Sequence, residues 1–315
     1  MNEATTTTGV DGDADAAASV VRLRLDLAYD GTAFAGWSRQ PGLRTVQGTI
    51  EQALETLFRR EGVAPRLVVA GRTDAGVHAT GQVAHLDVDR AAFRAVARPR
   101  RGVAESDPHA DPGAVLVRRL RGVLGSADDD VVVRSVRPAP EGFDARFSAV
   151  WRRYEYRIAD ADAEHDPLQR HRTVWYPREL DVEAMDVAAQ TLVGLGDFAA
   201  FCKPREGATT IRTLQSFRWR RAADGVLVAS LQADAFCHSM VRALVGSGVA
   251  VGEGRLGVEQ PGELMHARTR TSAFKVLPAK GLTLTEVGYP PEEDLAARAE
   301  QTRARRELHV DGVVG

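Results

Sequence analysis

The sequence has few of the residues that mark secreted, disulfide-built or membrane proteins. Its 315 residues include only two cysteines, Cys202 and Cys237, which cannot make a disulfide framework, so we interpret both as small buried hydrophobic residues. The first twenty residues contain no lysine or arginine and no long apolar run, which excludes an ordinary signal peptide. No stretch approaches the roughly 18 apolar residues that a membrane span needs. These absences favour a protein of the reducing cytoplasm with no membrane partner.

Lysine is scarce as well, because 38 of the 41 basic residues are arginines. The net charge of −2 does not by itself indicate a nucleic-acid partner. Arginine, however, is the side chain best suited to paired contacts with phosphate and to stacking on bases. The acids concentrate in the tails and on predicted helix faces, so a basic surface can coexist with a near-neutral total. The charge distribution is therefore compatible with RNA binding.

The hydrophobic pattern predicts the same order of elements twice. Alternating residues indicate strands, and the stripe that follows Thr45 indicates a capped helix. Each half has the order β-α-β-β-α-β, the split βαβ arrangement. We therefore predict an α+β fold of two ferredoxin-like halves, with antiparallel sheets side by side and a central catalytic cleft. The predicted strands are 21–29, 66–71, 82–88, 131–136, 154–158, 213–221, 225–234 and 282–288, and the predicted helices are 45–58, 114–124, 181–194 and 238–251.

Composition divides the chain further. Residues 1–20 are rich in Thr, Ala and Asp and are predicted to be a disordered tail. The two halves span 21–140 and 141–290, and 291–315 is a charged, helix-like tail. The stretch 98–113 is rich in Arg, Pro, Gly and Asp and is predicted to be a flexible insertion.

Two glycine-containing segments could bind a ligand. Gly246-Ser247-Gly248 lies in a predicted helix and lacks the ending of a phosphate-binding loop, so we interpret it as close helix packing. Gly71 to His78 reads GRTDAGVH and follows a buried strand. Glycines let its backbone turn sharply and let a ligand approach closely, and Arg72 can hold a nearby carboxylate ionised. An ordinary Asx turn around Asp74 explains the same spacing equally well, so the pattern alone leaves this choice open.

A resemblance decides between these interpretations. GRTDAGVH resembles the signature of the tRNA pseudouridine synthase A family, and other blocks resemble that family in the same order over roughly residues 21–289. The resemblance implies conversion of uridines 38, 39 and 40 of the tRNA anticodon stem-loop to pseudouridine. It also implies a homodimer whose tRNA bridges both subunits, with no cofactor and no metal. The other blocks are Tyr29-Asp30-Gly31 with Phe34, Gly36-Trp37 and Arg39-Gln40; Thr45-Val46-Gln47; Gly81-Gln82-Val83; Phe143 to Ser148; Arg152 to Tyr156; Gly196-Asp197-Phe198; and Phe236 to Arg242.

The resemblance also implies roles for individual residues. Asp74 is expected to be the catalytic nucleophile, with Arg242 against it. Tyr154 is expected to stack on the displaced uracil and to help move its C5 proton. A base inside a stem must leave the stack before an enzyme can reach it, and Arg72 is expected to hold the vacated space. Substrate-binding roles are expected for two further residues in these blocks, His78 and Arg39.

The chemistry of the reaction agrees with these residues. The isomerisation breaks the N1–C1′ bond and rejoins the base through C5, so no electrons enter or leave and no redox cofactor is needed. A carboxylate can serve as a covalent nucleophile, on either the ribose carbon or the uracil ring. No zinc site is predicted, because the histidines and cysteines show no CxxC or HxxxH pair. Two alternatives remain: a non-catalytic RNA-binding protein, and a pseudouridine synthase that acts on another RNA.

Overall fold

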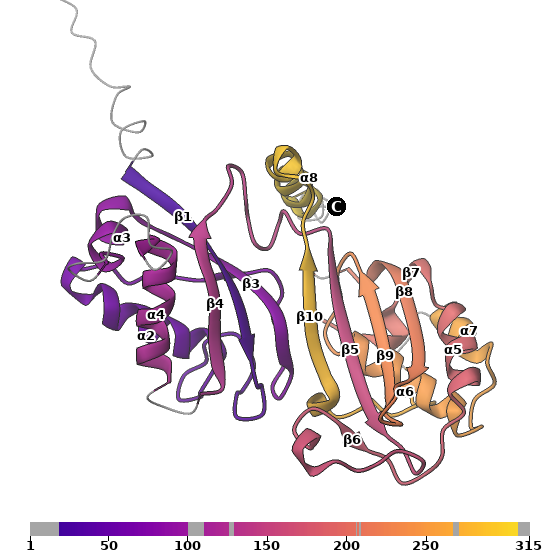
Figure 1. Ribbon diagram of the computed structural model, residues 1–315. Helices are drawn as coiled ribbons and strands as arrows, with labels where there is room; N and C mark the ends of the chain where they lie inside the picture. Colours follow the sequence, from indigo (N-terminus) through magenta and orange to yellow (C-terminus); the bar gives the residue numbers. More distant parts are fainter. Residues whose placement is uncertain are drawn as a thin grey trace, which may run out of the picture.

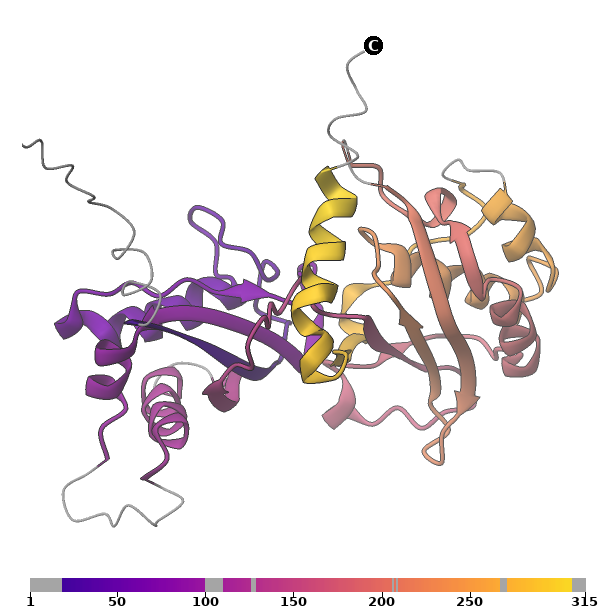
Figure 2. The same ribbon diagram turned by 90° about the horizontal axis from the view of Figure 1, so that it is seen from above.

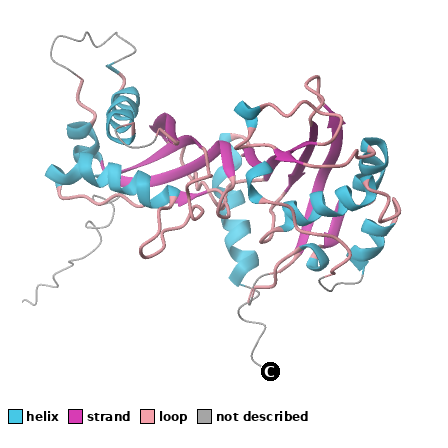
Figure 3. Ribbon diagram, turned by 90° about the horizontal axis from the view of Figure 1, so that it is seen from below, coloured by secondary structure: helices cyan, strands magenta, loops and turns pink. Residues whose placement is uncertain are grey.

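The computed structural model describes residues 19–99, 110–125, 129–205, 207, 209–266 and 271–307. Most of the predicted disordered tail, most of the 98–113 insertion and the last eight residues lie outside these ranges. Within them the chain forms one mixed sheet of ten strands, with helices gathered in two separate groups (Figures 1 and 3). No helix in this part of the chain combines the length and the apolar character that a membrane crossing requires.

The first half places its strands in the order fourth, first, third, second. β2 pairs only with β3, beside the path β4-β1-β3. Its strands are β1 (Val20–Tyr29), β2 (Val68–Val69), β3 (His78–Asp89) and β4 (Val131–Pro138), and its helices are α2 (Val46–Phe58), α3 (Arg90–Val96) and α4 (Pro112–Leu124).

The second half repeats this order as β10-β5-β9-β8 and adds β7 at the edge. The repeat confirms the predicted fold class. Its strands are β5 (Trp151–Ala159), β6 (Val174–Trp175), β7 (Gly194–Asp197), β8 (Ile211–Arg221), β9 (Leu227–Ala233) and β10 (Leu282–Gly288), and its helices are α5 (Val182–Gln190), α6 (Met240–Gly252), α7 (Gln260–His266) and α8 (Leu295–Glu307).

The two halves meet where β10 lies against β3. The pairing is parallel and short, with Thr283 opposite His78 and Leu284 opposite Ala79. Antiparallel pairs connect β10 to β5, so the sheet continues from one half into the other. Gly81 allows this approach, because a Cβ there would lie 1.9 Å from the carbonyl oxygen of Thr285.

The core follows from the alternation seen in the sequence. Leu23, Leu25 and Leu27 of β1 are fully buried, as are Ile50 and Leu54 of α2. The hydroxyl of Thr45 accepts a hydrogen bond from Gly48 N, so the predicted cap of α2 is confirmed. Burial of these side chains removes apolar surface from water, which is the main force holding helix to sheet.

The structure corrects several predicted bounds. β2 has two residues rather than six, and β3 begins at residue 78 rather than 82. The helix predicted over 181–194 ends at Gln190, and neither α3 nor β7 was predicted. These short elements carry too few residues for a periodic pattern to indicate them.

The charged segment after residue 290 is helical as predicted, and it is docked. Leu295 and Ala299 of α8 are buried, and the Ser148 hydroxyl donates to the carbonyl of Leu295 at 3.1 Å. Arg303 forms an ion pair with Asp144. Figure 2 shows α8 lying between the two helix groups, so this helix braces the joint between the halves.

Close helix packing explains the glycines of α6, as predicted. A Cβ at position 246 would lie 2.0 Å from the carbonyl oxygen of Lys275, and one at position 248 would lie 3.1 Å from the Trp219 indole nitrogen. Small residues at these two positions let α6 lie directly against its neighbours. No phosphate-loop role is needed to account for them.

Candidate active site

Asp74 lies in a loop that leaves the sheet after β2 and returns at β3. The loop backbone is bonded to an earlier segment of the chain instead of to a strand. Trp37 N donates to the carbonyl of Thr73 at 3.0 Å, and Gly76 N donates to the carbonyl of Phe34 at 3.3 Å. Gly76 has φ 76°, a left-handed conformation that favours glycine. The sequence therefore sets a fixed turn, and Asp74 is at its centre.

Buried polar side chains support this loop from below. The Gln82 amide donates to the hydroxyl of Tyr29 at 3.1 Å and to the carbonyl of Gly71 at 2.9 Å. The Tyr29 hydroxyl, which carries one proton, also lies 2.8 Å from the Thr73 hydroxyl, and either group can donate the hydrogen bond between them. Burial raises the pKa of Tyr29 to about 12, so it keeps that proton at physiological pH. The Arg152 guanidinium donates to the carbonyl of Ala70 at 2.7 Å.

His78 is part of this support, and its predicted contact with the substrate stays a prediction. Its side chain is buried. Nδ1 accepts from Gly31 N at 3.0 Å, and Nε2 lies 3.0 Å from the carbonyl of Lys280. Nδ1 also lies 3.0 Å from Asp30 Oδ1. Both ring nitrogens are thus occupied in joining the Asp74 loop to the start of β10.

The Asp74 carboxylate is partly exposed, with 36% of the side chain accessible. Among the described residues, the basic group at ion-pair distance from it is His238, whose Nε2 lies 3.7 Å from Oδ1. Arg242 was expected in that place. Its Nε instead donates to the carbonyl of Leu277 at 2.6 Å. The expected contact between Asp74 and Arg242 is therefore not formed in this structure.

One short segment ahead of β10 contacts Arg242, Tyr156 and the Asp74 loop. Leu277 accepts from Arg242, and Pro278 accepts from the Tyr156 hydroxyl at 2.7 Å. Ala279 lies against Gly76, where an added Cβ would come 3.3 Å from the Ala279 side chain. The chain leading into β10 thus holds the Asp74 loop and the start of α6 together.

Tyr154 differs from every other tyrosine of the chain. The hydroxyls of the other four, Tyr29, Tyr156, Tyr176 and Tyr289, are hydrogen-bonded. No partner is seen for the Tyr154 hydroxyl in the described part of the chain. Burial, first of all, raises the pKa of Tyr154, and the nearby Asp74 carboxylate acts in the same direction. The hydroxyl is therefore protonated and available to a substrate. The ring packs edge-on against Phe236, with centroids 5.1 Å apart.

The two remaining predicted residues have different surroundings. Arg72 is exposed, and its guanidinium has no partner among the described residues, as an intruding side chain requires. Arg39 is paired with carboxylates of α2, at 3.3 Å from Glu51 and 3.9 Å from Glu55. The same two acids also hold Arg66. Arg72 thus stands two residues before Asp74 with no partner for its charge in the described part of the chain, whereas Arg39 has local ionic partners.

The segment 234–239, called here the wall of the site, contacts both Asp74 and Tyr154. The sequence did not indicate these contacts. It supplies Phe236 and His238, and Lys203 N donates to the carbonyl of His238 at 2.9 Å. Cys237 is bonded to Cys202, with their Cα atoms 5.8 Å apart. Cys202 is buried, as predicted, and Cys237 is partly buried. The two lie 35 residues apart, and only the fold brings them together. His238 lies inside the Phe236 to Arg242 block, and the resemblance had placed it near the cleft with a local hydrogen bond rather than a catalytic role.

No group of three or more His, Cys, Asp or Glu side chains arranged to hold a metal ion occurs within the described ranges. The candidate site thus consists of a partly exposed carboxylate, a protonated phenol and an unpaired guanidinium. Such a set can supply a nucleophile, a proton-transfer group and a cation for RNA.

Comparison with known proteins agrees with this arrangement. A family model described as tRNA pseudouridine synthase matches residues 188–290. The chain is 61% identical to tRNA pseudouridine synthase A of Leifsonia xyli subsp. xyli, over 91% of this chain and 98% of that protein. It is 55% identical to the protein of the same name from Frankia casuarinae, over 91% and 96% of the two chains.

The chain belongs to the tRNA pseudouridine synthase A family. It is therefore a tRNA pseudouridine synthase, an isomerase that makes pseudouridine in tRNA and must bind RNA to do so. Identity of this extent covers both halves of the fold, including the loop of Asp74 and the wall of residues 234–239.

Proposed function

We propose that this tRNA pseudouridine synthase isomerises uridines 38, 39 and 40 of the anticodon stem-loop, with Asp74 as the nucleophile. The observation that carries the proposal is a partly exposed carboxylate near the one tyrosine hydroxyl that has no hydrogen-bond partner among the described residues. A turn-forming aspartate would need neither the exposure nor the neighbouring phenol.

The proposed reaction conserves all atoms and electrons. Asp74 attacks the ribose carbon or the uracil ring, and the N1–C1′ bond breaks. The base rotates and C5 bonds to C1′. The bond to Asp74 breaks, either as C5 displaces the carboxylate from C1′ or as the carboxylate is eliminated from the ring. C5 then loses its proton and N1 gains one. A neutral phenol is a poor base, so Tyr154 moves the C5 proton only as a relay that gives up its own proton at the same time. Its raised pKa favours this role over that of a fixed anion.

Base flipping is assigned to the unpaired Arg72. Its guanidinium can enter the space left by the displaced uridine. A cation without a protein partner can also form charge-assisted hydrogen bonds with RNA phosphates. Arg242 is retained as a proposed site residue. Its Nε donates to the carbonyl of Leu277, which leaves the terminal guanidinium nitrogens for Asp74, and we place that pairing in the RNA-bound state.

Asp74→Asn tests the proposal. Asparagine matches aspartate in size and can keep the turn, but it lacks the charge and the nucleophilic oxygen. We expect no tritium release from an anticodon stem-loop labelled at uridine C5. We also expect RNA affinity within about tenfold of wild type, a difference of about 1.4 kcal/mol.

A matched control separates a nucleophile from a turn. Asp166 accepts from Leu168 N at 2.8 Å and has only that local role, so Asp166→Asn should leave release unchanged. Tritium release by Asp74→Asn at a tenth of the normal rate or more would remove Asp74 as the nucleophile. Mapping pseudouridine in total RNA from a deletion strain would show whether another RNA is the substrate.

The remaining expectations concern the state of the protein. We propose a cytoplasmic homodimer whose tRNA bridges both subunits, and a monomer in light scattering at working concentrations would contradict it. We propose that no metal or other cofactor takes part. Turnover on a pre-folded stem-loop should then survive excess chelator, whereas a loss that zinc or magnesium restores would refute this.

A further inference from the structure

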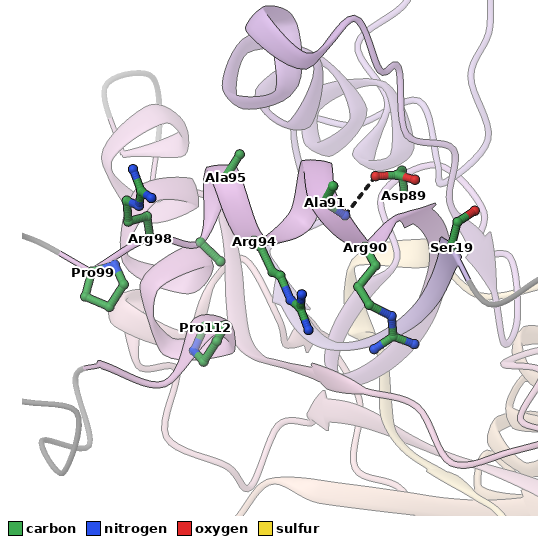
Figure 4. A pocket seen from close by; sticks show the side chains of 10 residues that line it. Ser19, Asp89, Arg90, Ala91, Arg94, Ala95, Arg98, Pro99 and Pro112 are labelled. Carbon is green, nitrogen blue, oxygen red and sulfur yellow. Dashed lines mark hydrogen bonds between the residues drawn. The ribbon is translucent and has the colours of Figure 1, made fainter.

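The outer end of the first half carries three arginines around a hollow. Arg90 and Arg94 are four residues apart on α3, and Arg98 follows at the same spacing. Together with Asp89 they line a cavity of about 740 Å³ (Figure 4). In the figure the Arg90 and Arg94 side chains extend from the same side of α3. We call these three residues the α3 arginine stripe.

The charges of the stripe are not neutralised by any residue that the structure describes. Asp89, the acid that lines the hollow, accepts from Ala91 N at 2.8 Å and from Ala92 N at 3.0 Å, so it caps α3. No guanidinium of the stripe has a hydrogen-bond or ionic partner in the described part of the chain.

Other arginines of the same half are paired differently. The guanidinium groups of Arg22, Arg24 and Arg44 each contact an aspartate within 3 Å. Like charges four residues apart destabilise a helix, so an unpaired row of them favours an anionic ligand over a structural role. The hollow between the side chains can admit a phosphate group of that ligand.

The distance between Asp74 and the stripe indicates which part of the tRNA can reach the stripe. β3 runs from His78, next to the Asp74 loop, to Asp89, the first residue before the stripe. Twelve strand residues at about 3.3 Å each span roughly 36–40 Å. A stem of about five base pairs spans only about 17 Å at about 3.4 Å per pair. A tRNA seated with a stem-loop uridine at Asp74 would therefore meet the stripe with a more distant part of its backbone.

We infer that the α3 arginine stripe binds the phosphate backbone of tRNA outside the anticodon stem-loop. The inference rests on the proposed function, because it takes the stem-loop uridine to lie at Asp74. Arginine forks match phosphate oxygens, and each neutralised phosphate releases counterions, so the stripe adds affinity without reading sequence. It is a binding surface for the body of the substrate, remote from the chemistry.

The test compares two double variants of full-length protein that lose the same charge. Arg90→Gln/Arg94→Gln removes part of the stripe. Arg59→Gln/Arg60→Gln removes two exposed arginines elsewhere in the same half. Affinity is measured over a range of salt concentrations for a whole tRNA transcript and for the isolated stem-loop.

The stripe variant should bind whole tRNA about tenfold more weakly and reduce the log–log salt slope by about 1–2. Its affinity for the stem-loop should stay within about twofold of wild type, as should its turnover at saturating tRNA. The control variant should change neither substrate by more than about twofold.

Three results would overturn the inference. Equal loss with both substrates, or equal loss in both variants, would mean a general charge effect. Unchanged affinity of the stripe variant for whole tRNA would mean no contact. A stripe variant that changes the oligomeric state in analytical ultracentrifugation would make the stripe a subunit contact. Failure of the proposed function would look different, because wild-type protein would then release no tritium from the stem-loop.

Discussion

β2 in the first half and β8 in the second occupy the same place in the order of their halves, but β2 has two residues and β8 has eleven. β8 covers β9 over most of its length and turns back through a tight connection. β2 pairs with β3 only at His85 and Ala84, which leaves the beginning of β3 without it.

Two features of the enzyme follow from that shortening. β10 pairs with the start of β3, along the strand edge that the short β2 does not cover. The second half therefore joins the first at this uncovered edge. The residues that would have extended β2 form the Asp74 loop instead, and the loop lies at this joint. The proposed active site lies where the repeat between the halves is broken, and the intact second half supplies the groups opposite Asp74.

The largest predicted effect is on the reaction rate, and it concerns two tyrosines of β5 in the intact second half. Tyr154→Phe keeps the ring that stacks on a base and removes a hydroxyl with no protein partner. Loss of one proton-transfer group should slow the single-turnover rate by about 10²–10⁴-fold, with tRNA affinity and thermal stability nearly unchanged. Rapid-quench assays and thermal unfolding measure the two quantities.

Tyr156→Phe is the matched control. It removes a hydroxyl that donates to the carbonyl of Pro278, so it should lower stability by about 0.5–1.5 kcal/mol and leave the chemical step within a few-fold. Near-normal turnover of Tyr154→Phe would leave Tyr154 as a stacking platform alone.

The joint between the halves can be broken at Gly81. Alanine there would place its Cβ 1.9 Å from the Thr285 carbonyl oxygen, so β10 must move away from β3. We expect a loss of stability of at least about 1–3 kcal/mol in urea unfolding, with lower activity because the Asp74 loop loses its neighbour.

Gly71→Ala serves as the comparison for that variant. A Cβ at position 71 would come no closer than 4.0 Å to the Arg152 side chain, and the backbone there is not left-handed. It should therefore be tolerated although it is nearer to Asp74. If both alanine variants unfolded at the same urea concentration, close approach of β10 would not be what Gly81 provides.

The sequence predicted what depends on period and on local chemistry. The alternation of β1, the Thr45 cap and the bounds of β10 all appear in the structure as expected. It did not predict what depends on contacts between distant segments. The order β3-β10 across the joint, the Cys202–Cys237 bond and the approach of His238 to Asp74 each join residues far apart in the chain.

Site residues divide in the same way. A motif can indicate that Asp74 and Tyr154 belong to a site, because those residue types fit the chemistry. It could not show that His78 is buried with both nitrogens bonded, or that Arg242 is held by Leu277. These outcomes depend on which partner is nearest after folding, and no spacing in the chain encodes that distance.

The smallest predicted effect comes from a comparison of α4 and α6, the second helices of the two β-α-β-β-α-β repeats. Gly122 of α4 is exposed, and an added Cβ would meet no atom within 4 Å, whereas Gly246 of α6 would meet the Lys275 carbonyl at 2.0 Å. Gly122→Ala should raise the free energy of unfolding by about 0.5–1 kcal/mol, because alanine loses less backbone entropy than glycine on entering a helix. Gly246→Ala should have the opposite sign, since its clash with the backbone outweighs the same entropic gain.

Urea unfolding of both variants beside wild type measures the difference, and activity should be unchanged for Gly122→Ala because α4 lies away from Asp74. Equal destabilisation by both substitutions would mean that the two helices are equally packed, and the asymmetry between the halves would then be limited to β2 and the joint.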